Sequence, residues 1–241
     1  MLRQIIYMII FIIGITLNTI WVPIVLVIRI LRLRKIDRWL GKKITGIQSK
    51  IYMSILGVKV SVSGKEHCRG LDGLPLCVIS NHQGILDIPI IIGWIPFPCG
   101  FVAKQELAYL PPFFVQMWYL RCVLINRSSP RSAVRAIERG VVNIKRGYPM
   151  LIFPEGTRSR GPGMGEFKHG SLKLAIRSEA TILPVTVNGT YKALEETGKA
   201  KAADISLVIH EPISIKGMSR EELKDLHLKL REVIGKGLKA E

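Results

Sequence analysis

A histidine and an aspartate five residues apart, His82 and Asp87, are the pair in this sequence best suited to proton transfer. They follow the apolar run 76–79, so we expect His82 where a strand ends and a turn begins, the edge at which α/β sheets present ligands. A carboxylate bonded to one ring nitrogen fixes the tautomer and stabilises the imidazolium as the other nitrogen takes a proton. On one straight helix the two side chains would lie on different faces, so the pairing needs a turn at Gly84. Taken alone, such a pair is more often structural.

A polar loop follows a second apolar run, 150–152, and presents Glu155, Gly156, Thr157 and Arg158. Planar guanidinium groups beside hydroxyls suit a phosphate, because they donate paired hydrogen bonds to its oxygens. The alternative is a solvated basic turn in which Glu155 pairs with an arginine.

Two more cations, Lys104 and Arg127, follow the apolar segments 100–103 and 123–126. Considered singly, Lys104 is expected on the surface. Together with His82 and the arginine loop, however, these cations stand at successive strand ends. Their convergence predicts one site for a phosphate-bearing substrate that has a proton to remove.

The elements that would position these residues follow an alternating α/β pattern. Residues 58–62 alternate between apolar and polar side chains, as in a half-buried strand. Helices are predicted over 131–146 and over 219–238, where Ser219 and Glu222 can form a capping box. Further apolar strands are predicted at 75–80, 100–103, 123–126, 150–153, 182–187 and 205–210. We therefore predict an α/β domain over 58–241, with a mixed or mainly parallel sheet flanked by helices.

The charge and the hydropathy of the chain point to a membrane surface. The 241 residues carry a formal charge of +17, although their mean hydropathy is +0.28. Residues 1–63 hold ten Lys or Arg and one acid, so this quarter of the chain carries +9. Cations that flank apolar residues suit anionic headgroups. Nucleic acid is the competing partner, but aromatic residues make up only 7% and no recognition motif is present.

Residues 4–28 contain no charged side chain and are long enough to span a bilayer as one helix. Gly14, Asn18 and Pro23 weaken that interpretation and favour a bent or interfacial helix. The basic cluster follows this run, which places the downstream domain in the cytoplasm.

A second amphipathic helix is predicted downstream, started by Asp37 and ended by Gly57. Its apolar stripe consists of Leu40, Ile44, Ile47, Ile51 and Ile55. This stripe either packs on the core of the domain or contacts a membrane. We favour a two-helix membrane anchor over 1–57, either spanning the bilayer or lying in one leaflet.

The remaining candidates are weaker. The strand 182–187 contains Pro184, which suggests an edge or a bulge beside a ligand. The four cysteines form no C-x-x-C pair, so we expect reduced, buried thiols and no metal site.

Four blocks, taken in order, resemble the glycerolipid acyltransferase superfamily, and most closely its 1-acyl-sn-glycerol-3-phosphate acyltransferases. The first and third blocks are the specific ones. The blocks are Asn81-His82-x4-Asp87, Val123-Leu124-Ile125-Asn126-Arg127, Phe153-Pro154-Glu155-Gly156-Thr157-Arg158 and Leu183-Pro184-Val185. The second block often begins with glycine, whereas that position here is Arg121, which would add charge beside the site.

The resemblance implies a glycerol-3-phosphate acyltransferase-like fold and transfer of an acyl group to lysophosphatidic acid, giving phosphatidic acid. It implies that His82, oriented by Asp87, is the general base and that no covalent acyl-enzyme forms. The implied acceptor site is Arg127, Glu155, Gly156, Thr157 and Arg158, with Lys104 joining it and Pro184 lining an acyl channel. It implies acyl-CoA or an acyl carrier protein thioester as co-substrate, with no metal or bound cofactor.

The expected partners are these substrates and an anionic phospholipid membrane, without nucleic acid. The expected location is the cytoplasmic side of the cell membrane. Two alternatives stay open: a sibling acyltransferase that uses glycerol 3-phosphate or another lysophospholipid, and a non-catalytic basic module that binds membranes or nucleic acid.

Overall fold

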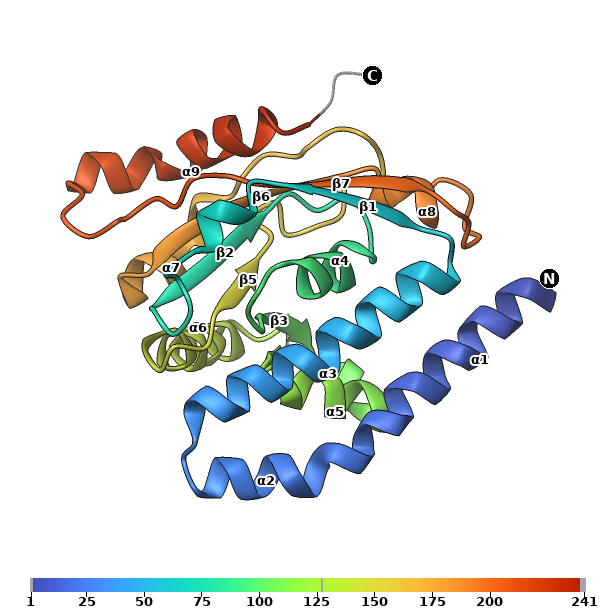
Figure 1. Ribbon diagram of the computed structural model, residues 1–241. Helices are drawn as coiled ribbons and strands as arrows, with labels where there is room; N and C mark the ends of the chain where they lie inside the picture. The colour runs from blue at the N-terminus through green and yellow to red at the C-terminus, as the bar shows by residue number, and fades with distance from the viewer. Residues whose placement is uncertain (1, 127, 239–241) are drawn as a thin grey trace.

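The computed structural model describes residues 2–126 and 128–238 of the chain. Its helices pack on both faces of one sheet (Figure 1). The α-helices are α1 (Leu2–Leu17), α2 (Val22–Ile30), α3 (Arg34–Ile55), α4 (Asp87–Trp94), α5 (Pro111–Tyr119), α6 (Pro130–Lys145), α7 (Lys173–Ser178), α8 (Thr190–Ala193) and α9 (Arg220–Gly235). The strands are β1 (Lys59–Ser63), β2 (Leu76–Ser80), β3 (Gly100–Lys104), β4 (Val123–Ile125), β5 (Met150–Ile152), β6 (Thr181–Asn188) and β7 (Asp204–Ile209).

The sheet is mixed, in the order β1-β7-β6-β2-β5-β3-β4. Strands β6, β2, β5, β3 and β4 run parallel, while β7 is antiparallel to β6 and parallel to β1. The predicted mixed α/β sheet flanked by helices is confirmed. Because the parallel strands share one direction, the segments that follow β2, β3, β4 and β5 emerge at the same edge of the sheet.

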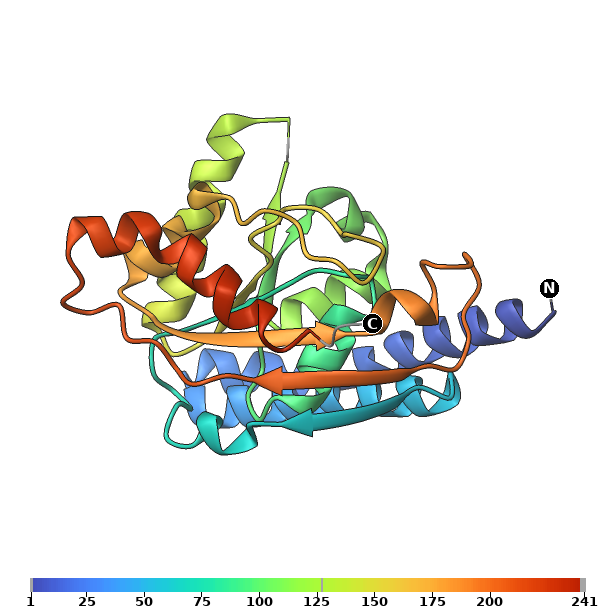
Figure 2. The same ribbon diagram turned by 90° about the horizontal axis from the view of Figure 1, so that it is seen from above.

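The central strand β2 lies between two layers of helices, and all five of its residues are buried. Leu76 and Val78 face a core that α3 and α4 cover, whereas Cys77 and Ile79 face a second core under α6, α7 and α9. The two views show these helix groups on opposite faces of the sheet (Figures 1 and 2). A strand buried on both faces is apolar throughout, which accounts for the continuous apolar run before His82.

Helix starts follow local sequence signals. The predicted capping box forms at α9, where the backbone N–H of Glu222 donates to the Ser219 hydroxyl at 3.2 Å and Glu222 accepts from the Ser219 N–H at 2.7 Å. The helix predicted from 131 begins one residue earlier, and Ser129 caps it through the N–H of Ser132.

The N-terminal segment forms two antiparallel arms (Figure 1). The first arm is α1 and α2, joined by the 3-10 turn η1 (Asn18–Trp21), and the second arm is α3. In the described part of the chain, Gln4–Ile30 is the single helical stretch whose length and composition would allow it to cross a membrane. The expected bend is present at η1, next to Pro23.

The C-terminal part of the apolar stripe of α3 faces outward, whereas Leu40 and Ile44 are half-buried. Ile47 and Ile51 are 55% and 53% exposed, while the buried face of this helix includes Gly41, Thr45 and Ser49. These small residues let α3 approach α4 closely, because a Cβ at Gly93 would lie 3.3 Å from the Ser49 side chain. A different face of the helix therefore packs on the domain, and the expectation that the stripe packs on the core is wrong for Ile47, Ile51 and Ile55. Contact of these residues with a membrane stays a prediction.

Replacing both exposed isoleucines, Ile47→Glu with Ile51→Glu, should lower partitioning onto vesicles by at least about tenfold, because charge would replace apolar area where we expect α3 to contact a membrane. The melting temperature should change little. The measurement is co-sedimentation with phospholipid vesicles. The matched control is Val142→Glu with Leu228→Glu, on exposed positions of α6 and α9. Equal losses in the two pairs would contradict a membrane contact at α3.

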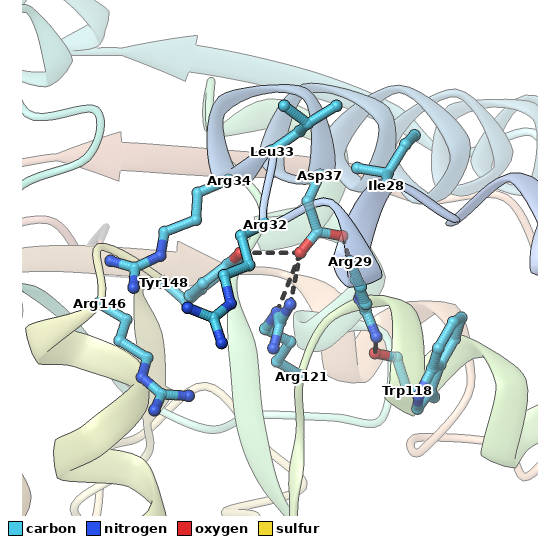
Figure 3. A pocket seen from close by; sticks show the side chains of 10 residues that line it. All are labelled: Ile28, Arg29, Arg32, Leu33, Arg34, Asp37, Trp118, Arg121, Arg146 and Tyr148. Carbon is cyan, nitrogen blue, oxygen red and sulfur yellow. Dashed lines mark hydrogen bonds and ion pairs between the residues drawn. The ribbon is translucent and has the colours of Figure 1, made fainter. Parts of the chain in front are cut away.

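Asp37 is not the N-cap of α3, which begins at Arg34. Its buried carboxylate instead joins three segments: it accepts from Arg29 Nε at 3.0 Å, from Arg121 Nη2 at 2.7 Å and from the Tyr148 hydroxyl at 2.8 Å (Figure 3). Arg29 also donates to the carbonyls of Trp118 and Tyr119. This network fastens the turn between α2 and α3 to the domain.

Asp37→Asn should lower the free energy of unfolding by about 3 kcal/mol at neutral pH, since it leaves two guanidinium groups without their counter-charge. Burial alone would raise the pKa of Asp37, but Arg121 and Arg29 outweigh burial and hold that pKa below its ordinary value. A depressed folded-state pKa gives stabilisation that is complete above the unfolded-state pKa and is lost as the pH falls through the folded-state pKa. Urea unfolding from pH 7 to pH 3 should therefore show the difference between wild type and variant shrinking with acid. A constant difference would contradict this account; Asp225→Asn, on the exposed face of α9, is the control.

Candidate active site

The turn between β2 and α4 brings His82 and Asp87 together. His82 Nδ1 lies 2.7 Å from Asp87 Oδ2, and the same oxygen accepts from the Gly84 N–H at 2.9 Å. The other oxygen, Oδ1, accepts from the hydroxyl of Thr190 at the start of α8. The fully buried carboxylate is thus held on both oxygens and fixes Nδ1 as the protonated nitrogen of the imidazole. Within the residues described, Nε2 has no hydrogen-bond partner, so it is the nitrogen that can accept a proton.

The turn itself is clamped to neighbouring segments. Asn81 exchanges two hydrogen bonds with the backbone of Val187, at 2.8 and 2.9 Å. Gln83 accepts from the Gly189 N–H at 2.8 Å. The His82 ring stacks on Phe153, with 3.9 Å between ring centroids and 13° between planes. These contacts hold the imidazole in one orientation.

Glu155 supports this turn from behind. Its carboxylate accepts from the His82 N–H at 2.7 Å and from the Gly165 N–H at 2.8 Å. Burial raises the pKa of Glu155 above its ordinary value, although the hydrogen bonds from Gly165 and His82 act against that. The side chain does not line the cavity in front of His82. Glu155 therefore joins the two loops of the site and is not placed to touch a substrate.

A cavity of about 850 Å³ opens in front of His82 at the carboxyl edge of the parallel strands. Its polar lining comes from His82, Lys104, Thr157, Arg158, Arg160 and Ser171. Its apolar wall includes Ile88, Phe101, Ile125, Ile137, Leu151 and Leu174. The cavity thus combines a proton acceptor, cations and an extended apolar surface, the combination that a phosphorylated amphiphile requires.

Two cations of the cavity have acidic neighbours. Arg158 Nη1 donates to Glu195 Oε1 at 3.0 Å, and the same oxygen accepts from the Ile85 N–H at 2.7 Å. The Lys104 ammonium lies 3.9 Å from Glu106, and both side chains are more than half exposed. Arg158 is therefore held by a hydrogen bond, whereas the ion pair of Lys104 is longer and exposed to solvent.

Most of the predicted residues meet at this edge. His82, Lys104, Gly156, Thr157 and Arg158 line the cavity, with Asp87 and Glu155 behind them. Arg127 lies outside the described residues.

Two expectations are corrected. Pro184 does not line the cavity, because it lies buried within β6, between β2 and β7. Arg121 is not beside the site, because it precedes β4 and so lies at the amino edge of the sheet, bonded to Asp37.

Two residues that hold the side chains of the site in place were missed. Thr190 lies two residues after β6, so its position at a strand end, like that of His82, could have indicated it. Glu195 follows α8, and no pattern in the sequence links it to Arg158.

Residues 59–188 match the family model described as Acyltransferase, which covers more than half of the chain and the described residues that line the cavity. The chain belongs to the acyltransferase family. Among curated relatives, this acyltransferase is 29% identical over 190 residues to a 1-acyl-sn-glycerol-3-phosphate acyltransferase of Borreliella burgdorferi, covering 78% of this chain and 75% of that protein. It is 32% identical over 156 residues to the chloroplastic 1-acyl-sn-glycerol-3-phosphate acyltransferase BAT2 of Brassica napus, covering 62% of this chain and 45% of the relative.

The acyltransferase therefore spans less than half the length of the Brassica napus relative, and the same holds for an Arabidopsis thaliana relative, at 44%. Its fold matches the crystal structure of a 1-acyl-sn-glycerophosphate (LPA) acyltransferase from Thermotoga maritima with a TM-score of 0.75 and 28% identity. That match covers 98% of this chain and 96% of the other. The likeness includes the N-terminal arms as well as the sheet.

Proposed function

We propose that the protein transfers an acyl group from a thioester, acyl-CoA or an acyl carrier protein, to the sn-2 hydroxyl of lysophosphatidic acid, giving phosphatidic acid. The observation that carries the proposal is the His82–Asp87 pair facing a cavity with cations on one side and an apolar wall on the other. The names of the relatives support the same acceptor.

In the proposed reaction, Nε2 of His82 takes the proton of the acceptor hydroxyl as its oxygen attacks the thioester carbonyl. The new ester C–O bond forms, the C–S bond breaks and the thiolate leaves, receiving the proton back from the imidazolium. Asp87 stabilises that imidazolium through Nδ1. The chain's own groups carry this scheme without a metal, a cofactor or a covalent acyl-enzyme.

Arg158 is the proposed ligand of the acceptor phosphate, with Thr157, Gly156 and Lys104 beside it. We assign Glu155 a positioning role, because it holds the backbone of His82. In this proposal, the exposed apolar residues of α1, α2 and α3 contact the membrane. The basic N-terminal cluster favours the cytoplasmic side for the domain and its cavity.

Arg158→Ala should lower kcat/KM for lysophosphatidate by about 10- to 100-fold, because it removes a charge-assisted hydrogen bond to the phosphate. The KM for the thioester should change much less. Steady-state kinetics with each substrate varied in turn measures the difference, and Arg139→Ala, on the exposed side of α6, is the control. Equal losses for donor and acceptor would argue against phosphate binding by Arg158.

A further inference from the structure

A second cavity, of about 550 Å³, lies at the edge of the sheet opposite the candidate active site (Figure 3). Arg121 and Tyr148 line it just before β4 and β5 begin, whereas Ile125 and Ile152 line the first cavity where the same strands end. A strand of three residues is about 10 Å long. Because the two cavities share no lining residue, the second one is a separate site.

This second cavity is strongly cationic. Five arginines line it, and Asp37 is the one acidic side chain among its described lining residues, so the local charge is +4. The Asp37 carboxylate is already occupied by Arg29, Arg121 and Tyr148. The arginines are Arg29, Arg32, Arg34, Arg121 and Arg146.

Three of these guanidinium groups have no counter-charge among the described residues. Arg32, Arg34 and Arg146 make no ion pair with any residue in 2–126 or 128–238, and all three are exposed. Figure 3 shows them reaching toward the same opening from the α2–α3 turn and from the end of α6. Like charges gathered in one opening repel one another, and an anion would relieve that repulsion. Guanidinium forks match the oxygens of a phosphate.

The backbone conformation of two of the five arginines is unusual. Arg32 and Arg121 adopt left-handed conformations, with φ of 56° and 55°, a region that favours glycine. At Arg121 the resemblance to the family leads one to expect glycine. The arginine there contacts Asp37 and also lies over the Tyr148 ring, 4.1 Å from its centroid. Its side chain therefore compensates for an unfavourable backbone position.

The lining of the cavity also has apolar side chains, Ile28, Leu33 and Trp118, and Leu33 is 42% exposed, which decides between kinds of anion. Ile30 and Leu31, directly before Arg32, are 75% and 61% exposed. We infer that this cavity binds the phosphate of an anionic phospholipid whose acyl chains lie along the exposed residues of α2. This inference goes beyond the proposed reaction and does not rest on it.

The test is calorimetric titration of the 241-residue chain in neutral detergent with dihexanoyl phosphatidylglycerol and no thioester. Wild type should bind one equivalent at this site. The variant Arg34→Gln with Arg146→Gln should bind it at least about tenfold more weakly, since two charge-assisted hydrogen bonds are lost. Arg139→Gln with Arg177→Gln, which removes the same charge from exposed positions outside both cavities, should bind within about twofold of wild type. The melting temperatures of both variants should match that of wild type.

Two comparison ligands identify the source of the phosphate. Inorganic phosphate should compete at the same site but bind at least about tenfold more weakly than the lipid, because it gains nothing from the apolar residues of the cavity and of α2. Dihexanoyl phosphatidylcholine, which carries no net charge, should also bind more weakly. Equal losses in the two double variants, or no loss in either, would overturn the site. Inorganic phosphate binding as tightly as the lipid would overturn its assignment to a phospholipid.

Discussion

His82→Ala should reduce kcat for acyl transfer to lysophosphatidate by about a thousandfold or more, because general-base assistance contributes about 10²–10⁴-fold. Among the described side chains of the cavity, His82 is the one whose ring both stacks on Phe153 and bonds a carboxylate, that of Asp87, through Nδ1. The measurement is the rate of thiol release from the thioester at saturating acceptor. The product is quantified in parallel.

The loss of kcat can be assigned to the chemical step only if the His82→Ala variant stays folded and bound to the membrane. His82 lies on a turn that Asn81, Gln83 and Glu155 hold independently of the ring. We therefore expect unchanged vesicle binding. His227→Ala, on α9, removes a histidine outside the cavity and should keep full activity. Turnover near the wild-type rate in the His82 variant would rule out the proposed base.

Asp87→Asn should lower kcat by about 10²–10⁴-fold, as expected when a histidine loses the carboxylate that sets its tautomer. The amide would present an N–H group to Nδ1 and favour protonation at Nε2, the nitrogen that has to accept the proton. The KM for lysophosphatidate should change little, because Asp87 lies behind His82 and does not line the cavity.

In this variant the amide N–H₂ group would also face the Gly84 N–H, which would lose its acceptor. Some loss of stability is therefore expected in addition to the loss of turnover. The melting temperature and vesicle binding separate that loss from the loss of turnover. A folded Asp87→Asn protein whose kcat lies within a few-fold of wild type would show that the carboxylate does not orient the base.

The sheet and the edge that carries the site were predictable, because both depend on short stretches of sequence. A run such as 76–79 is apolar throughout only because β2 is buried on both faces, and polar residues directly after it must lie at the sheet edge. The same reasoning correctly placed Lys104 and Arg158 at the cavity. The capping box at Ser219 is equally local.

Pairings between distant residues were not predictable in this way. The bond between Asp37 and Arg121 joins residues 84 apart, and the bond between Arg158 and Glu195 joins residues 37 apart. No periodicity encodes either one. The buried face of α3 was not predictable for a different reason: small side chains such as Ser49 bury well against a neighbouring helix, so the most apolar face was not the buried one.

The most direct measurement of the proposed activity is product analysis with the purified protein, a thioester donor and lysophosphatidic acid. We predict phosphatidic acid formed in equal amount to the released thiol, no acylated protein by mass spectrometry, and background rates in His82→Ala. Release of thiol without phosphatidic acid, or an acylated protein that forms and decays during turnover, would contradict direct transfer assisted by His82.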